Sequence, residues 1–174
     1  SLKKKIKIIF SKILKDINLS IKKLKNNHIS GTKFSVDLVS KEHNHHRSYK
    51  DIKILINKSS IDKKVKEIAI NIFYILAKAE SEVHGVNIDK VSFHEIGAWD
   101  SIIDNIISAF IINKFNTEYN VTWSCSTIPI GSGMINTAHG ALSVPAPATT
   151  LLLKSFPVID DGIKGERITP TGAA

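Results

Sequence analysis

Residues 62–85 read DKKVKEIAINIFYILAKAESEVHG, and this stretch decides the core of the fold. Its apolar residues recur every three or four positions, which is the spacing of one face of an amphipathic helix. Gly85 follows as a helix stop signal. The apolar face consists of Val65, Ile68, Ala69, Ile72, Leu76, Ala79 and Val83. The stretch therefore predicts a long helix with one buried face.

A shorter helix is expected immediately before this one. Ser48 and Asp51 have the spacing of an N-terminal capping pair, and Ile52 and Ile56 share one helical face. Only a few residues separate the two helices, so we expect them to pack as a helical hairpin over residues 48–85.

The other expected elements are shorter, and they complete an α+β fold. All five prolines and six of the nine glycines follow Thr127, which favours glycine- and proline-rich loops near the end of the chain. In chain order we expect an amphipathic helix at 3–16, a β-hairpin at 19–38, a short strand at 91–94, a helix at 99–115 buried on most of its circumference, a strand at 121–130 and a short helix at 146–154. The expected organisation is a helix and β-hairpin at 1–40, a histidine-containing linker at 41–47, and a helical hairpin with an α+β core at 48–174.

The charge and the cysteine content exclude several classes of protein. The net charge is +8, but residues 1–66 hold 18 basic and 5 acidic residues, whereas residues 67–174 hold 6 and 11. The lysines lie among isoleucines and asparagines without interleaved aromatic residues, so we interpret them as solvated faces and expect no nucleic-acid partner. The single cysteine excludes a disulfide framework. The sequence contains no run of eighteen apolar residues, so we expect no membrane-spanning helix. We expect a cytoplasmic protein with no membrane partner.

The segment 93–104, FHEIGAWDSIID, is the strongest candidate for chemistry. On a helical wheel Asp104 lies 40° from Asp100 and shares a side with several isoleucines, so both carboxylates are expected to face apolar packing. An ionised carboxylate there needs compensation, and no Lys or Arg stands three or four residues away. In one interpretation, a metal ion or a cationic ligand compensates the charge, and His94 and Glu95 lie at the same site. In the other, Asp100 caps the helix and Asp104 forms hydrogen bonds to buried groups. For His94, Glu95 and Asp104 together we favour a site.

Other candidate residues are weaker. His139, between glycine-flanked turns, is either a ligand or acid/base group or a polar loop residue. His43, His45 and His46 give a weak metal-loading signal, and His84 suits a helix C-terminus. Cys125 is expected to be a small buried residue rather than a nucleophile. The backbone N–H groups of Gly131-Ser132-Gly133 and Thr169-Pro170-Thr171-Gly172 either hold a phosphate or form ordinary turns.

Several motifs together resemble the LarC family of nickel-insertion proteins. They are VSFHEIGAWDSIID at 91–104, PIGSG at 129–133, AHG at 138–140, VPAPAT at 144–149 and TPTGAA at 169–174. The resemblance extends from the hairpin at 29–33 to the last residue, and it departs from the family pattern at Trp99, Asn105 and Ser143. The opening motif of the family is absent and the chain stops at Ala174, so we expect an internal fragment. The C-terminal domain of the same protein is also expected to be missing.

The resemblance implies a nickel insertase, or chelatase, of the lyase class. Its substrate would be a pyridinium bis-thiocarboxylic acid mononucleotide, which CTP-dependent cyclometallation converts into the nickel pincer cofactor of lactate racemase-type enzymes. An apo acceptor enzyme would be a further partner. CTP and its divalent metal are associated with the missing C-terminal part, so this chain is not expected to bind them.

These motifs and the residue chemistry give the expected site. We expect His94, Glu95 and Asp104 to be catalytic, and His94, Asp100, Asp104 and His139 to handle nickel. The substrate would lie on Gly131, Ser132, Gly133, Thr169, Thr171 and Gly172. Two alternatives remain: a nickel metallochaperone without its own catalysis, and a metal-dependent hydrolase with an open water position.

The charge distribution yields a first prediction. Because the lysines are expected to lie on solvated faces, the chain should bind generic duplex DNA weakly at physiological salt and lose that binding steeply as salt rises. Fluorescence anisotropy with a labelled duplex across a salt series measures this. Sequence-specific binding that resists salt would contradict it.

Overall fold

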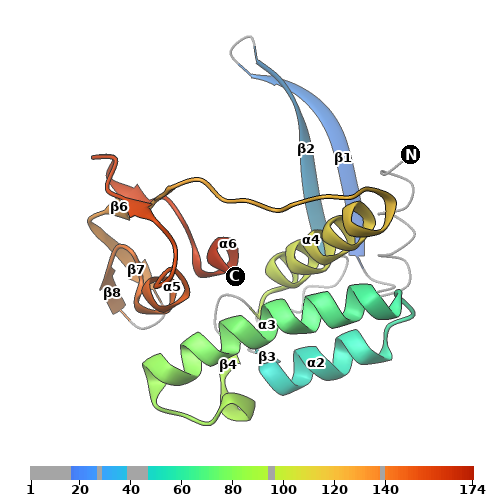
Figure 1. Cartoon of the computed structure of the whole chain (residues 1–174), viewed down its shortest axis with the longest axis horizontal. Coiled ribbons are helices and arrows are strands. Elements are labelled where there is room, and N and C mark those ends of the chain that lie inside the picture. Colours follow the sequence, from blue (N-terminus) through green and yellow to red (C-terminus); the bar gives the residue numbers. More distant parts are fainter. Residues whose placement is uncertain (1–16, 27–28, 39–46, 94–96, 138–139) are drawn as a thin grey trace.

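The computed structural model describes residues 17–26, 29–38, 47–93, 97–137 and 140–174. Its centre is a set of helices, with a long β-hairpin rising from one side and a small lobe of short strands on the other (Figure 1). The architecture is α+β, as the sequence predicts. The expected helix at 3–16 lies outside the described residues, as does the linker up to residue 46.

The predicted helical hairpin is confirmed as helices α2 (Tyr49–Lys58) and α3 (Lys63–His84), which pack against each other. The Ser48 hydroxyl accepts a hydrogen bond from the Asp51 N–H at 3.1 Å, and the Asp51 carboxylate accepts one from the Ser48 N–H at the same distance. Asp62 caps α3, and Gly85 ends it in the left-handed conformation at a φ of 63°. Local sequence signals therefore set both ends of this hairpin.

Helix α4 (Trp99–Glu118) lies across α3 and is enclosed on most sides. Ile102, Ile103, Ile106 and Ala109 are fully buried, while Phe110 is half-buried. Asn105 is also buried, and its amide donates to the Ser101 carbonyl oxygen at 3.0 Å. The expectation of a largely buried third helix is confirmed.

The long hairpin rests on α4. Strands β1 (Ile17–Asn26) and β2 (Ile29–Leu38) pair antiparallel over their whole length, and Phe34 and Val36 pack against Ile103. Its far end extends away from the helices, where Ile29 is 77% exposed (Figure 1). The hairpin predicted at 19–38 is therefore present, with one end on the core and the other in solvent.

An extended segment leads from α4 to the C-terminal lobe (Figure 1). The strand predicted at 121–130 is wrong: only Ile128–Pro129 are in a strand, and Trp123 is 57% exposed. Among the described residues, no strand pairs with residues 121–127 and most of their side chains are exposed, so the alternation of apolar and polar residues does not make a strand here.

Short elements make up the lobe, and α5 attaches it to α3. Gly131, at a φ of +76°, cannot be replaced without strain, because an added Cβ would lie 2.0 Å from the Gly165 carbonyl oxygen. The predicted short helix at 146–154 is confirmed as α5. The bounds are β5 (Ile128–Pro129), β6 (Gly131–Ser132), β7 (Met134–Thr137), β8 (Gly140–Ser143), α5 (Pro147–Leu152), β9 (Val158–Ile159), β10 (Gly165–Glu166) and α6 (Pro170–Ala173).

Two short strands join the helices to the candidate segment. Strand β3 (Arg47–Ser48) pairs antiparallel with β4 (Ser92–Phe93), and the 3-10 helix η1 (Ile88–Lys90) lies between α3 and β4. Arg47, expected at the end of an exposed linker, is therefore half-buried in a strand. In the described part of the chain, no helix combines the length and the hydropathy that a membrane span needs.

The burial pattern predicts how the core responds to truncation. Ile106→Ala removes a fully buried side chain and should lower the free energy of unfolding by about 2–5 kcal/mol. Ile54→Ala is a matched control on α2, because Ile54 is 42% exposed and should cost much less. Urea unfolding followed by circular dichroism measures both. Equal losses in the two variants would contradict this assignment of the core.

Candidate functional site

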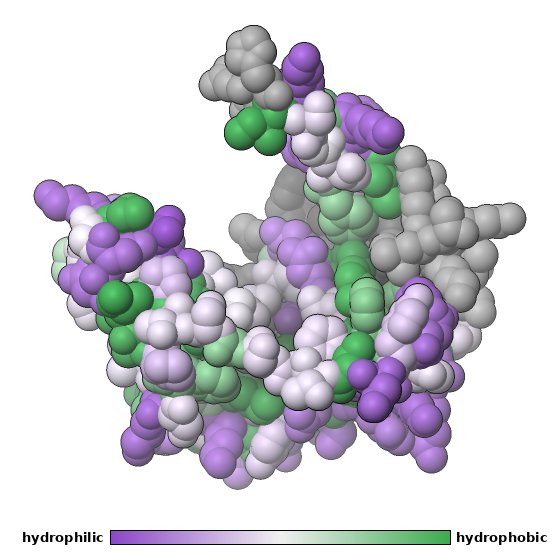
Figure 2. Space-filling view, turned by 45° about the horizontal axis from the view of Figure 1, so that its top comes forward, coloured by the Kyte–Doolittle hydropathy of each residue, from purple (hydrophilic) through white to green (hydrophobic). Residues whose placement is uncertain are grey.

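A cavity of about 960 Å³ lies between the long hairpin, the helices and the C-terminal lobe. Figure 2 shows it as a hollow in the molecular surface, with hydrophobic residues along the side formed by the hairpin and α4. Ile21 and Phe34 of the hairpin line one part, and Ile135 and Leu142 of β7 and β8 line another. The cavity is thus enclosed by elements from across the sequence.

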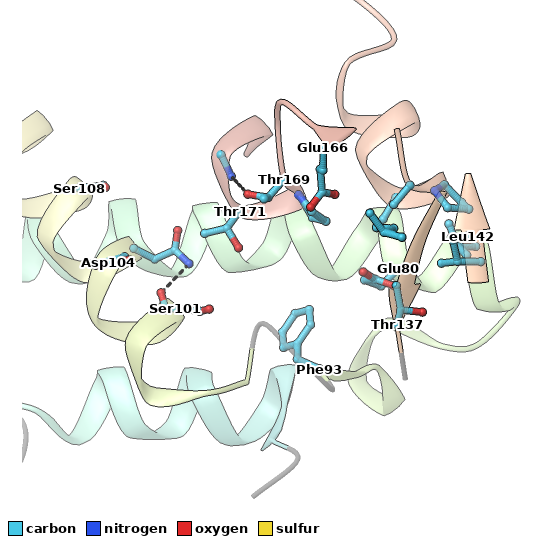
Figure 3. Close-up of a pocket in the computed structure, with 18 of the residues that line it drawn as sticks. Glu80, Phe93, Ser101, Asp104, Ser108, Thr137, Leu142, Glu166, Thr169 and Thr171 are labelled. Atoms are coloured by element: carbon cyan, nitrogen blue, oxygen red, sulfur yellow. Dashed lines mark hydrogen bonds between the residues drawn. The ribbon is translucent and has the colours of Figure 1, made fainter. Parts of the chain in front are cut away.

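The motif segments singled out in the sequence converge on this cavity. Asp104 lines it from α4, and residues 169–172 line it from α6 and its N-cap (Figure 3). Residues 146–148, from the proline-rich motif, line it as well. Phe93 and Thr137, which precede the histidine motifs, also lie on its wall. The predicted residues His94, Glu95 and His139 are outside the described residues.

Other predicted site residues are not brought to the cavity. Residues 131–133 are absent from the lining that the structure describes, although Glu166, which pairs with Gly131, is part of it. Asp100 lies in the first turn of α4, where its carboxylate accepts a hydrogen bond from the Ser101 N–H at 2.8 Å. The N-cap of α4 is Ala98, two residues before Asp100, so the interpretation of Asp100 as the N-cap residue is wrong.

Asp104 is exposed toward the cavity rather than packed against apolar side chains. The expectation that Asp100 and Asp104 face apolar packing is therefore wrong, because the side of α4 that carries them borders open space. The protein around Asp104 still removes part of its hydration, and this raises the pKa of the carboxyl group above its ordinary value. The negative charge of Asp100 raises the pKa further.

Thr169 holds the C-terminal motif in place. Its hydroxyl accepts a hydrogen bond from the Gly172 N–H at 3.2 Å and so caps α6. That N–H is therefore already used within the motif, which favours the turn interpretation of this segment over the phosphate-binding one. The hydroxyls of Thr169 and Thr171 remain on the cavity wall.

The comparisons with known proteins agree with these motifs. The sequence model described as nickel insertion protein matches residues 2–174. The chain belongs to the nickel insertion protein family. Relatives named for nickel insertion include those of Dictyoglomus thermophilum (42% identical over 161 residues), Geotalea uraniireducens (44% over 158) and Geotalea daltonii (50% over 129). These alignments cover 92%, 90% and 74% of this chain and 40%, 39% and 32% of the relatives. The chain thus spans about two-fifths of the length of the first two relatives, and no solved structure matches it.

This member of the nickel insertion family has cavity residues to which the sequence interpretation gave no role in the site. Glu80 and His84 of α3 lie on the wall, as does Glu166 of β10, and Ser101 and Ser108 add hydroxyl groups from α4. Among the described lining residues there is no lysine or arginine, although the chain carries 24. Glu80 and His84 stand four residues apart, and this spacing on one helix face was the available signal.

Arg47 stabilises the chain beside the histidine motif. Its guanidinium donates to the Gly97 carbonyl oxygen at 2.8 Å and stacks on Trp99, with its central carbon 4.0 Å from the ring centroid. Gly97 has no room for a side chain, because an added Cβ would lie 2.5 Å from the Phe93 carbonyl oxygen. These contacts fix the start of α4 relative to β4.

Metal-binding groups are sparse in the part of the chain that the structure describes. There, no three His, Cys, Asp or Glu side chains come together closely enough to hold a metal ion. Cys125 is exposed, which corrects the expectation of a buried cysteine. Of the four predicted metal ligands, the two carboxylates are described, and only Asp104 lies on the cavity.

The raised pKa of Asp104 gives a prediction about stability. The native state holds the Asp104 proton more tightly than the unfolded chain, so Asp104 lowers stability as pH rises from 3.8, its ordinary pKa, through the raised value. Asp104→Asn should therefore slightly raise the free energy of unfolding at neutral pH, and the gain should disappear below pH 3.8. Urea unfolding across a pH series measures this.

The matched control is Asp89→Asn, which removes an exposed carboxylate away from the cavity. A gain of the same size in both variants, or a gain for Asp104→Asn that persists at low pH, would contradict the assignment.

Proposed function

We propose that this chain forms the substrate-holding part of a nickel insertase that acts on a pyridinium bis-thiocarboxylic acid mononucleotide. The observation that carries the proposal is the convergence of Asp104, residues 146–148 and residues 169–172 on one cavity, with Phe93 and Thr137 beside the two histidine motifs. Segments separated by up to 79 positions in the sequence thereby line the same cavity. Membership of the nickel insertion protein family and the names of its relatives support the choice of nickel.

The lining of the cavity suits the ring and the sugar of such a substrate. Ile21, Phe34 and Leu142 provide apolar surface for a flat ring, and the hydroxyls of Thr169 and Thr171 provide hydrogen-bonding groups for a sugar. The carboxylates favour positive charge, which both a pyridinium ring and a nickel ion carry. Nickel also accepts sulfur ligands, which the thiocarboxylic acid groups would supply.

Asp104 has a defined role in this proposal. When a nickel–carbon bond forms on the ring, the ring carbon loses its proton, and a base must accept it. The raised pKa of Asp104 makes its carboxylate a better proton acceptor than an ordinary aspartate. We place Asp104 at this step, together with Glu95 or a histidine of the motif.

CTP belongs elsewhere in the proposed reaction. A triphosphate needs several cationic groups or a bound metal ion, and the described lining of this cavity contains no lysine or arginine. We therefore assign CTP and its divalent metal to the remainder of the longer family proteins, and an apo acceptor enzyme to the step after insertion.

A nickel metallochaperone is the second candidate function, favoured by the exposed carboxylate and imidazole groups on the cavity wall. Stoichiometry separates the two. A chaperone should bind nickel equally with and without the mononucleotide, whereas an insertase should bind nickel more tightly when the substrate sulfurs complete the coordination shell. Equilibrium dialysis with both additions measures the difference.

The proposed function predicts the effect of Asp104→Asn on insertion. The test uses this chain fused to the remaining part of the Dictyoglomus thermophilum relative, supplied with nickel, the mononucleotide and CTP. Because the substitution keeps the shape and removes the charge, the variant should fold normally and lose nickel insertion by about 100-fold or more. Mass spectrometry of the mononucleotide measures insertion, and Asp89→Asn is the control. Normal insertion by a well-folded Asp104→Asn variant would refute the role of Asp104.

A further inference from the structure

Helix α3 presents two metal-binding side chains to the cavity near its C-terminal end. Glu80 and His84 are one helical turn apart, and both line the cavity. Figure 3 shows the Glu80 carboxylate on the cavity wall. Neither residue belongs to the segment 93–104 or to the glycine-containing motifs, and the sequence interpretation gave His84 only a role at the helix end.

The geometry of this pair matches that of a chelate. His84 Nε2 lies 3.3 Å from Glu80 Oε2. A first-row divalent metal binds nitrogen and oxygen at about 2.0–2.2 Å, so two adjacent ligands of one metal ion lie about 2.9–3.4 Å apart. The two side chains stand at ion-pair distance, and two adjacent ligands of one metal ion can occupy the same separation.

The chemistry of the pair also suits nickel. An imidazole and a carboxylate are ligands that Ni²⁺ accepts, and neither is soft enough to retain it against sulfur. Asp104 and Glu166 lie on other parts of the wall and add negative charge that attracts a dication. A two-ligand site leaves most coordination positions open, which a metal in transit needs and a closed structural site lacks.

We propose that Glu80 and His84 form the site that receives Ni²⁺ before its insertion. The role of the pair in receiving nickel rests on the proposed function. The existence of the site rests on the geometry of Glu80 and His84 alone. The pair holds the ion on the α3 wall. The sulfur ligands of the substrate then replace Glu80 and His84 as the ion moves to the substrate.

The experiment measures nickel binding to the 174-residue chain directly. It uses a background in which His43, His45 and His46 are replaced by Asn, because those residues would add nickel binding of their own. Glu80→Gln and His84→Asn should each weaken the affinity for Ni²⁺ by about 10- to 100-fold in equilibrium dialysis. Glu67→Gln is the matched control on the same helix, since Glu67 is exposed and lies outside the cavity lining. It should leave the affinity unchanged.

Paramagnetic line broadening in NMR spectra locates the ion independently of affinity. Broadening centred on Glu80 and His84 supports the site, whereas broadening elsewhere, or unchanged affinity in both variants, overturns it. The insertion assay with the fused protein tests the role separately. Unimpaired insertion by His84→Asn would overturn the receiving role, while an absence of insertion in the unsubstituted protein would refute the proposed function and leave the nickel site standing.

Discussion

The burial of helix α3 is the constraint on which the rest of the structure depends. Val65, Ala69, Phe73 and Leu76 are almost fully removed from water, and α2, α4 and α5 all pack on this helix. Because the helix repeats every 3.6 residues, fixing this face also fixes the direction of its last turns. The polar side chains near its C-terminus are therefore held on the cavity wall by a core that lies mostly elsewhere.

A second set of contacts holds the helices to the candidate motif. The Arg47 guanidinium bonds to the Gly97 carbonyl oxygen and stacks on Trp99, while β3 pairs with β4. An arginine can do both because its planar guanidinium offers donors in the plane and a flat face for stacking. Trp99, where the sequence indicates a departure from the family pattern, provides the surface for that stacking.

The charge of the molecule is divided in a way that fits a cationic cargo. The basic excess belongs to the first 66 residues, and the described lysines of the long hairpin lie exposed on its strands. The described cavity lining instead carries carboxylates from α3, α4 and β10. Since the cavity excludes part of the water around them, these carboxylates attract cations more strongly than they would on an open surface. Net charge alone would have suggested the opposite class of ligand.

The sequence by itself determined the local elements of this protein. The helical hairpin, its caps at Ser48 and Asp62, and the long β-hairpin follow from periodicity and end signals, which are properties of neighbouring residues. The strand expected at 121–130 failed because a strand also needs a partner, and Cys125 was misplaced for the same reason. The wheel put Asp100 and Asp104 on one side of a helix, yet only packing could decide that Asp104 borders the cavity and Asp100 does not. The tertiary structure alone brought Glu80, His84 and Glu166 to the wall with the recognised motifs, because long-range packing sets which faces meet and local sequence patterns carry no information about it.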